Sequence, residues 1–211
     1  MKTGIKLFLA AIALAVTAPV VAQGFSDGFN FLKAVKERNG TDAEKYLKAA
    51  NGGVIVNSKN DGTGETALHI VAENRYDNWT GFLLQHGANP NLADKQGVTP
   101  LMVAVRSNFP DAVDWLLKYK AKIDQTNRKG ETALVWAVQL NKPEMVRVLM
   151  RAGANADRAD FSGQSARDYA TNSRASGLLA IIESKGASAD DAKKSDLSGL
   201  DFSGIGKKPA Q

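Results

Sequence analysis

Cysteine is absent from the 211-residue sequence, and only two histidines occur, His69 and His86. Without cysteine there can be no disulfide framework, no thiolate zinc site and no cysteine nucleophile. The two histidines are 17 positions apart in the chain. They are too few and too distant for a histidine-rich metal site, so we expect no metal and no other cofactor.

A large surplus of charge of one sign is also missing. The chain has 27 Lys and Arg against 22 Asp and Glu, for a net charge of +5. Proteins that coat nucleic acid usually carry far more positive charge, so we expect no nucleic-acid partner. The 44% hydrophobic and 23% charged residues exclude a disordered chain and a collagen, and they fit a globular protein.

The sequence has a single long hydrophobic run, at residues 7–16. Lys2 and Lys6 precede it, Pro19 interrupts it, and Ala22 offers a small residue before a cut. This pattern is typical of a secretory signal peptide over residues 1–22. An uncleaved anchor would need about 20 apolar residues, so we expect no membrane insertion after cleavage. The sequence therefore predicts export, to a bacterial periplasm first and to the medium second.

The remainder of the chain repeats every 33 residues. Acidic or amide residues, then glycines, then hydroxyl residues recur in one register: Asp61, Asp94, Asn127, Asp160; Gly64, Gly97, Gly130, Gly163; and Thr66, Thr99, Thr132, Ser165. Such a period is the signature of a repeat protein, in which neighbouring units supply each other's core.

The segments GETALHIVA (64–72), GVTPLMVAV (97–105), GETALVWAV (130–138) and GQSARDYA (163–170) carry a family resemblance. The chain resembles ankyrin-repeat proteins, in register over 58–190 and more loosely over 25–57. The resemblance implies an all-α repeat solenoid of about five units. Each unit would be a helix–turn–helix with a short β-hairpin loop, and the stack would present a concave binding face.

The period divides the chain into units. We expect an N-terminal capping repeat at 23–57, ankyrin repeats at 58–90, 91–123 and 124–156, and a C-terminal capping repeat at 157–190. The polar composition of 191–211 predicts a flexible tail. Its apolar residues would either fold back on the last helix or dock on a partner: Leu197, Leu200, Phe202 and Ile205.

Several repeated positions have structural explanations. Thr66, Thr99, Thr132 and Ser165 are suited to cap the first helix of each unit, and Pro100 suits its first position. Pro110 and Pro143 would open second helices. Lys120 stands where Gly87 and Gly153 end such helices, and a left-handed cap there should cost up to ~1 kcal/mol relative to glycine.

The chemically versatile side chains also have structural readings. His69 occupies the position where the family carries a histidine that hydrogen-bonds between hairpins, and His86 suits a helix end. Trp136 and Tyr169 share a repeat position with Ile70 and Val103, which predicts that they lie in the core. No nucleophile elbow or converging carboxylate pair is present, so we expect no enzyme. An enzyme with an unrecognised site is a remote alternative.

The positions that the fold does not require lie on the hairpin tips and on the exposed side of the first helices. These are the predicted partner-binding residues: Lys95, Gln96, Val98, Arg106, Ser107, Arg128, Lys129, Glu131, Gln139, Leu140 and Phe161. Their basic character predicts an acidic or mixed-charge protein partner, bound by a monomer. The leading hypothesis is an exported scaffold that protects, regulates or neutralises an envelope protein. The alternative is a secreted effector that binds a protein of another cell.

Overall fold

A computed structural model describes residues 20–76, 78–173 and 176–185. Residues 1–19 of the predicted leader and the whole predicted tail lie outside this part of the chain. The helix α1 begins at Val20, so the expected cut after Ala22 would remove its first three residues. No helix in the described ranges has the length and apolar character needed to cross a membrane.

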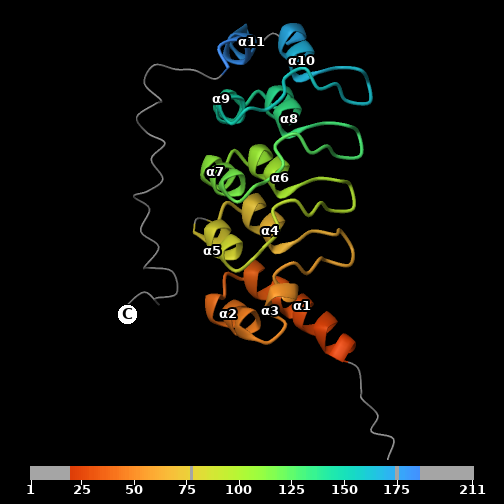
Figure 1. Cartoon of the computed structure of the whole chain (residues 1–211), viewed down its shortest axis with the longest axis vertical. Helices are drawn as coiled ribbons and strands as arrows, with labels where there is room; N and C mark the ends of the chain where they lie inside the picture. The colour runs from red at the N-terminus through yellow and green to blue at the C-terminus, as the bar shows by residue number, and fades with distance from the viewer. Residues whose placement is uncertain (1–19, 77, 174–175, 186–211) are drawn as a thin grey trace, which may run out of the picture.

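The described residues form an all-helical stack, as the 33-residue period predicts (Figure 1). Three helices make the first layer: α1 (Val20–Lys36), α2 (Gly40–Lys48) and α3 (Gly52–Ile55). Four antiparallel pairs follow: α4 (Ala67–Glu73) with α5 (Trp79–Gln85), α6 (Pro100–Arg106) with α7 (Pro110–Lys118), α8 (Ala133–Gln139) with α9 (Pro143–Arg151), and α10 (Ala166–Asn172) with α11 (Ser176–Glu183). The stack therefore has about five units, and the predicted fold class is confirmed.

Helix starts follow the predicted capping chemistry. The hydroxyl of Thr99 accepts a hydrogen bond from the backbone N–H of Met102 at 3.3 Å. Thr132 accepts from Val135 at 3.2 Å, and Ser165 accepts from Asp168 at 3.2 Å. The prolines at 100, 110 and 143 each stand at the first residue of a helix. Their missing N–H costs nothing there, because the first turn has no acceptor for it.

The second helices end in left-handed residues. Gly87 and Gly153 both have φ of 86°, and Lys120 has φ of 67° at the equivalent position. Lys120 has a Cβ and still adopts the conformation that glycine adopts in the neighbouring units, and the expected energetic cost stays a prediction. This conformation is strained for lysine.

The core runs through the stack without a break between units. Leu68, Leu101 and Leu134 recur at the repeat period and are at most 1% exposed. The equivalent residue of the last pair is Arg167, which is only partly buried and forms an ion pair with Asp157 at 2.6 Å. Among the residues that the structure describes, no further unit covers the last pair, so a charged residue there stays in contact with water.

The core prediction was only half right for Trp136 and Tyr169. Both pack against the core but remain partly exposed. The indole N–H of Trp136 donates to Glu131 Oε2 at 2.9 Å, and the hydroxyl of Tyr169 donates to Asp160 Oδ2 at 2.8 Å. Each side chain needs a polar partner for its N–H or O–H, and such partners lie at the hairpin surface.

Candidate functional site: the hairpin tips and first helices

Each hairpin tip is held by one side chain that bonds to the backbone of its own turn. In the hairpin before α6, Asp94 Oδ1 accepts from the N–H groups of Gln96 at 2.7 Å and Val98 at 2.8 Å. Asn127 Oδ1 does the same in the next hairpin, accepting from Lys129 at 2.8 Å and Glu131 at 3.0 Å. The repeated Asp and Asn therefore form turns.

The first hairpin departs from the period. Its turn is held by Asn60, whose Oδ1 accepts from Gly62 and Thr63, both at 2.9 Å. Asn60 N–H also bonds to Glu65 O at 2.8 Å, and this loop is one residue longer than that between Asp94 and Val98. Asp61, which aligns with Asp94 in the sequence, is exposed and does not hold the turn. The 33-residue period therefore assigns the wrong residue to this turn: the structural equivalent of Asp94 is Asn60 and not Asp61.

Backbone hydrogen bonds join successive tips into a ladder. Lys95 N–H donates to Thr63 O at 2.9 Å, Arg128 N–H to Gln96 O at 3.0 Å, and Phe161 N–H to Lys129 O at 3.0 Å. In Figure 1 these hairpins project on the same side of the stack, one above another. The ladder fixes the register of the tips, so their side chains form one surface.

Inside this ladder glycine is required by its positive φ and by the close approach of the next hairpin's backbone. Gly97 has φ of 77°, and a Cβ on it would lie 2.9 Å from the backbone nitrogen of Arg128. At Gly130 (φ 79°) a Cβ would lie 2.8 Å from the nitrogen of Phe161. Gly163 has the same backbone conformation, φ 81°, but nothing within 4 Å of its Cβ position. The close approach thus exists only where another hairpin follows among the described residues.

A chain of polar contacts crosses three units on the helix side of this surface. Arg106 forms an ion pair with Glu73 of the preceding unit at 2.5 Å. Its guanidinium carbon lies 5.7 Å from the centre of the Trp136 ring of the following unit, a cation–π distance. Trp136 in turn donates to Glu131. These contacts hold Arg106 in place, so it is only partly available to a partner.

The structure places most of the predicted binding residues at the surface. The exposed ones are Lys95, Gln96, Arg106, Arg128, Lys129, Gln139, Leu140 and Phe161, whereas Ser107 and Glu131 are partly buried. Ser107 Oγ donates to Glu73 O at 3.3 Å, beside Arg106. The ammonium of Lys95 donates to the carbonyl oxygen of Asp61, across the first two tips.

Val98 is a correction to the predicted list. Its side chain is only 9% exposed and belongs to the hydrophobic core. Both of its backbone polar groups are used, the N–H by Asp94 and the carbonyl oxygen by His69. The chain turns inward at this residue to enter α6, so Val98 serves the fold and cannot contact a partner on the surface.

Phe161, Arg128 and Lys129 form what we call the tip patch. Phe161 is 80% exposed, the largest exposure among the large apolar side chains of the described part. Its Cδ1 would lie 2.7 Å from a Cβ at Gly130, so the ring rests against the preceding hairpin. Arg128 and Lys129 are exposed on that hairpin. Aromatic side chains and Arg are enriched at protein interfaces, which makes this patch the candidate contact surface.

His69 is buried and links two units. Thr66 N–H donates to its Nδ1 at 3.1 Å, so Nδ1 is an acceptor and the proton of the neutral ring is on Nε2. Nε2 donates to Val98 O at 3.0 Å in the next hairpin. Burial lowers the pKa of His69 because it disfavours the charged ring. Within the described ranges, no group of three His, Asp or Glu side chains could hold a metal.

The sequence did not reveal that Trp136 contributes to this surface. One signal was available: an indole is larger than the isoleucine and valine at the equivalent positions, and its N–H needs a partner. Glu131, five residues earlier and on the tip, supplies that partner.

Comparison with known proteins agrees with this geometry. The family described as "Ankyrin repeats (3 copies)" matches residues 31–127 and 111–192. No curated protein matches the chain closely enough to count as a relative. Ankyrin repeats are typically non-enzymatic modules that bind proteins. Because the match covers most of the sequence and the helices stack as paired units, the chain belongs to the ankyrin-repeat family.

Proposed function

We propose that this protein is an exported scaffold that, as a monomer, binds an acidic or mixed-charge protein through its hairpin tips and first helices. It would have no chemistry of its own and would protect, regulate or neutralise its partner. The family match supports protein binding in general. The tip patch carries the finer proposal, because it places an 80% exposed phenylalanine next to two exposed cations.

Charge supports an acidic partner at the tip patch more than elsewhere on this surface. Arg106 is neutralised by Glu73, with which it forms an ion pair. In the described part of the chain, the ion pairs do not involve Arg128 or Lys129. A carboxylate of the partner could therefore pair with either cation while an apolar group contacts Phe161. Leu140, 44% exposed, would extend the apolar contact toward α8.

The leader-like residues 1–22 support export, because they combine basic residues with one apolar run and a small residue before the expected cut. Retention in the envelope of the producing cell would favour an envelope partner. Release into the medium would favour the alternative, an effector that acts on another cell. Fractionation of the producing cells distinguishes the two.

The decisive experiment uses residues 23–211 as bait in an envelope extract, with bound proteins identified by mass spectrometry. One variant carries Arg128→Glu and Lys129→Glu, and a second carries Phe161→Ser. The matched control carries Lys118→Glu and Lys122→Glu, which change the charge equally at exposed positions outside the tip patch. Circular dichroism verifies that every variant is folded.

A specific partner that is kept by the control and lost by both tip-patch variants would support the proposal. Its affinity for the purified protein should fall by at least tenfold on the Arg128 and Lys129 changes, and more steeply at low salt. Equal binding by all variants would overturn the assignment of the face.

A further inference from the structure

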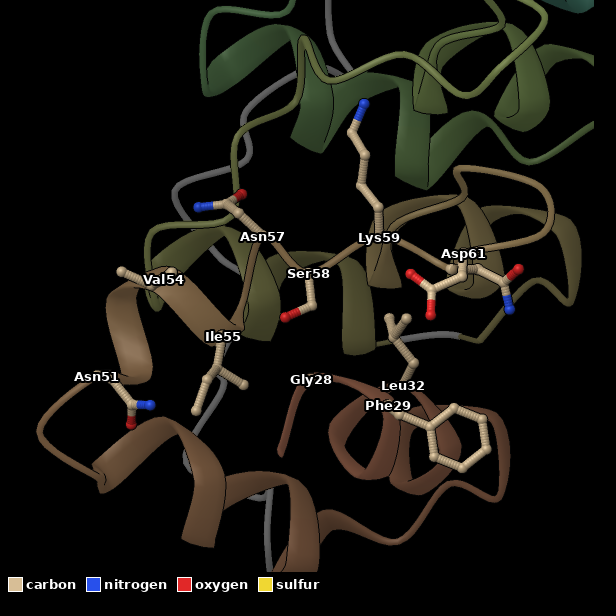
Figure 2. Close-up of a pocket in the computed structure, with 11 residues that line it drawn as sticks. Gly28, Phe29, Leu32, Asn51, Val54, Ile55, Asn57, Ser58, Lys59 and Asp61 are labelled. Carbon is tan, nitrogen blue, oxygen red and sulfur yellow. The ribbon is translucent and has the colours of Figure 1, made fainter. Parts of the chain in front are cut away.

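The first unit contains a groove that the proposed function does not use. A cavity of about 400 Å³ lies between α1, α3 and the segment that leads into the first hairpin. Its walls are mainly apolar, from Phe29 and Leu32 on α1 and from Val54 and Ile55 on α3, with Ser58 and Asp61 along the hairpin side (Figure 2).

This groove exposes apolar surface to an unusual degree for this molecule. Phe29 is 66% exposed and Val54 is 76% exposed. In the described part of the chain, only Leu140 and Phe161 are comparable, and both belong to the surface proposed for a partner. Two large apolar side chains at the rim of one groove make it the candidate docking surface of the first unit.

The last unit offers a contrast. Among the described side chains of α10 and α11, none is a strongly exposed large hydrophobic residue, and Leu178 and Ile182 are at most 2% exposed. An apolar segment that folded back on these helices would find little apolar surface there. Of the two ends of the stack, the first unit is the better acceptor.

We propose that the groove of the first unit binds the C-terminal segment 197–205 of the same chain. This segment contains Leu197, Leu200, Phe202 and Ile205 in an otherwise polar stretch. If the segment is extended, Leu200 and Phe202 point to the same side, because side chains alternate along a strand. That side can contact the apolar walls of the groove.

The length of the chain permits this contact. The described part ends at Lys185, 17 residues before Phe202. Extended chain covers about 3.3 Å per residue, so this tether reaches roughly 56 Å. Packed helices lie about 8–10 Å apart, so the four steps from the last unit to the first amount to roughly 40 Å. A tether of this kind also gives an effective concentration on the order of millimolar, so a weak contact is enough.

The absence of native cysteine makes the proposal directly testable in the mature chain, residues 23–211. The variant with Val54→Cys and Phe202→Cys should form a disulfide within one molecule under mild oxidation. The control with Leu140→Cys and Phe202→Cys places the first thiol at an exposed apolar residue outside the groove. A cross-link in the first variant that greatly exceeds that in the control, and does not depend on protein concentration, would support the proposal.

Three other results would overturn it: equal cross-linking in both variants, preferential cross-linking to position 140, or cross-links only between molecules. The last result would indicate that a second copy fills the groove. Labelling of a single thiol gives an independent measurement. Deletion of 191–211 should speed the reaction of Val54→Cys severalfold and leave that of Leu140→Cys unchanged, and an unchanged rate at both positions would contradict the proposal.

Discussion

The hairpins before α8 and α10 have the same turn and different surroundings. In the first, Asn127 holds the turn and Gly130 lies against the backbone of the following hairpin, with a Cβ position 2.8 Å from Phe161 N. In the second, Asp160 holds the same turn, with its Oδ1 accepting from Ser162 at 2.8 Å, but a Cβ at Gly163 would meet nothing within 4 Å. The local conformation is therefore a property of each unit, whereas the close approach depends on a neighbour.

This difference separates two contributions to the stability of a repeat protein. One is the intrinsic stability of a unit, and the other is the interface with the next unit. Substitutions at equivalent positions of interior and terminal units can measure each contribution, because the local chemistry is the same.

The largest effect should come from Gly97→Ala. The substitution adds backbone strain at φ 77° and a Cβ that is 2.9 Å from Arg128 N, so we expect a loss of about 3 kcal/mol in the free energy of unfolding. Gly163→Ala has only the strain and should lose about 1 kcal/mol. Urea unfolding followed by circular dichroism measures both values. Equal losses in the two variants would show that the close approach between hairpins does not add to the destabilisation caused by the new Cβ.

His69→Gln should have the next largest effect. At pH 7 it removes the bond between His69 and Val98 O of the next unit and should cost about 1–3 kcal/mol. The folded pKa of His69 is lowered, so below its ordinary value near 6.5 the unfolded chain binds more protons than the folded chain. Stability of the unsubstituted protein should therefore fall as the pH drops from about 6.5 to 5.

The His69→Gln variant should lack the fall in stability between about pH 6.5 and 5 that the His69 ring causes. The lowered pKa values of Asp157, Asp160 and Asp168 affect stability in a more acidic range, as the pH falls through and below their ordinary values. Burial raises the pKa of Asp114, which is present in both proteins, so the difference between their unfolding curves at pH 5, 6 and 7 isolates His69. An identical slope with and without His69 would refute the assignment.

A gain is expected from Lys120→Gly. Lys120 has φ of 67°, so glycine should stabilise the protein by up to about 1 kcal/mol. The reciprocal change, Gly153→Ala, meets no neighbouring atom within 4 Å and should lose a similar amount through the backbone alone. Thermal unfolding of the two variants tests whether equivalent caps are energetically interchangeable.

Arg106→Gln should change stability least, by less than about 1 kcal/mol, because its ion pair with Glu73 is solvent-exposed. It should nevertheless alter the fluorescence of Trp136, since the guanidinium lies over that ring. The same substitution in a Trp136→Phe background supplies the control. A change that persists without Trp136 would place the effect on another tryptophan.

The 33-residue period, the capping hydroxyls and the helix-opening prolines were sufficient to predict the stack, because each acts within a unit. The period also predicted the left-handed conformation of Lys120 from two glycines at equivalent positions. It failed at the first hairpin, where one additional residue moved the turn-forming role from Asp61 to Asn60. A strict alignment does not detect a change in loop length when the flanking helices keep their register.

The contacts between units could not be predicted from the sequence. The pairing of Arg106 with Glu73 and its contact with the Trp136 ring join residues 30 or more positions apart, and the burial of Val98 depends on how its hairpin faces the preceding unit. The groove between α1 and α3 likewise appears only when two helices and the segment leading into the first hairpin are brought together. The sequence by itself determined the repeat, its caps and its turns, since these depend on hydrogen bonds and backbone preferences within a few residues. Only the tertiary structure decided which side chains are free to meet a partner, because exposure depends on what the adjacent unit covers.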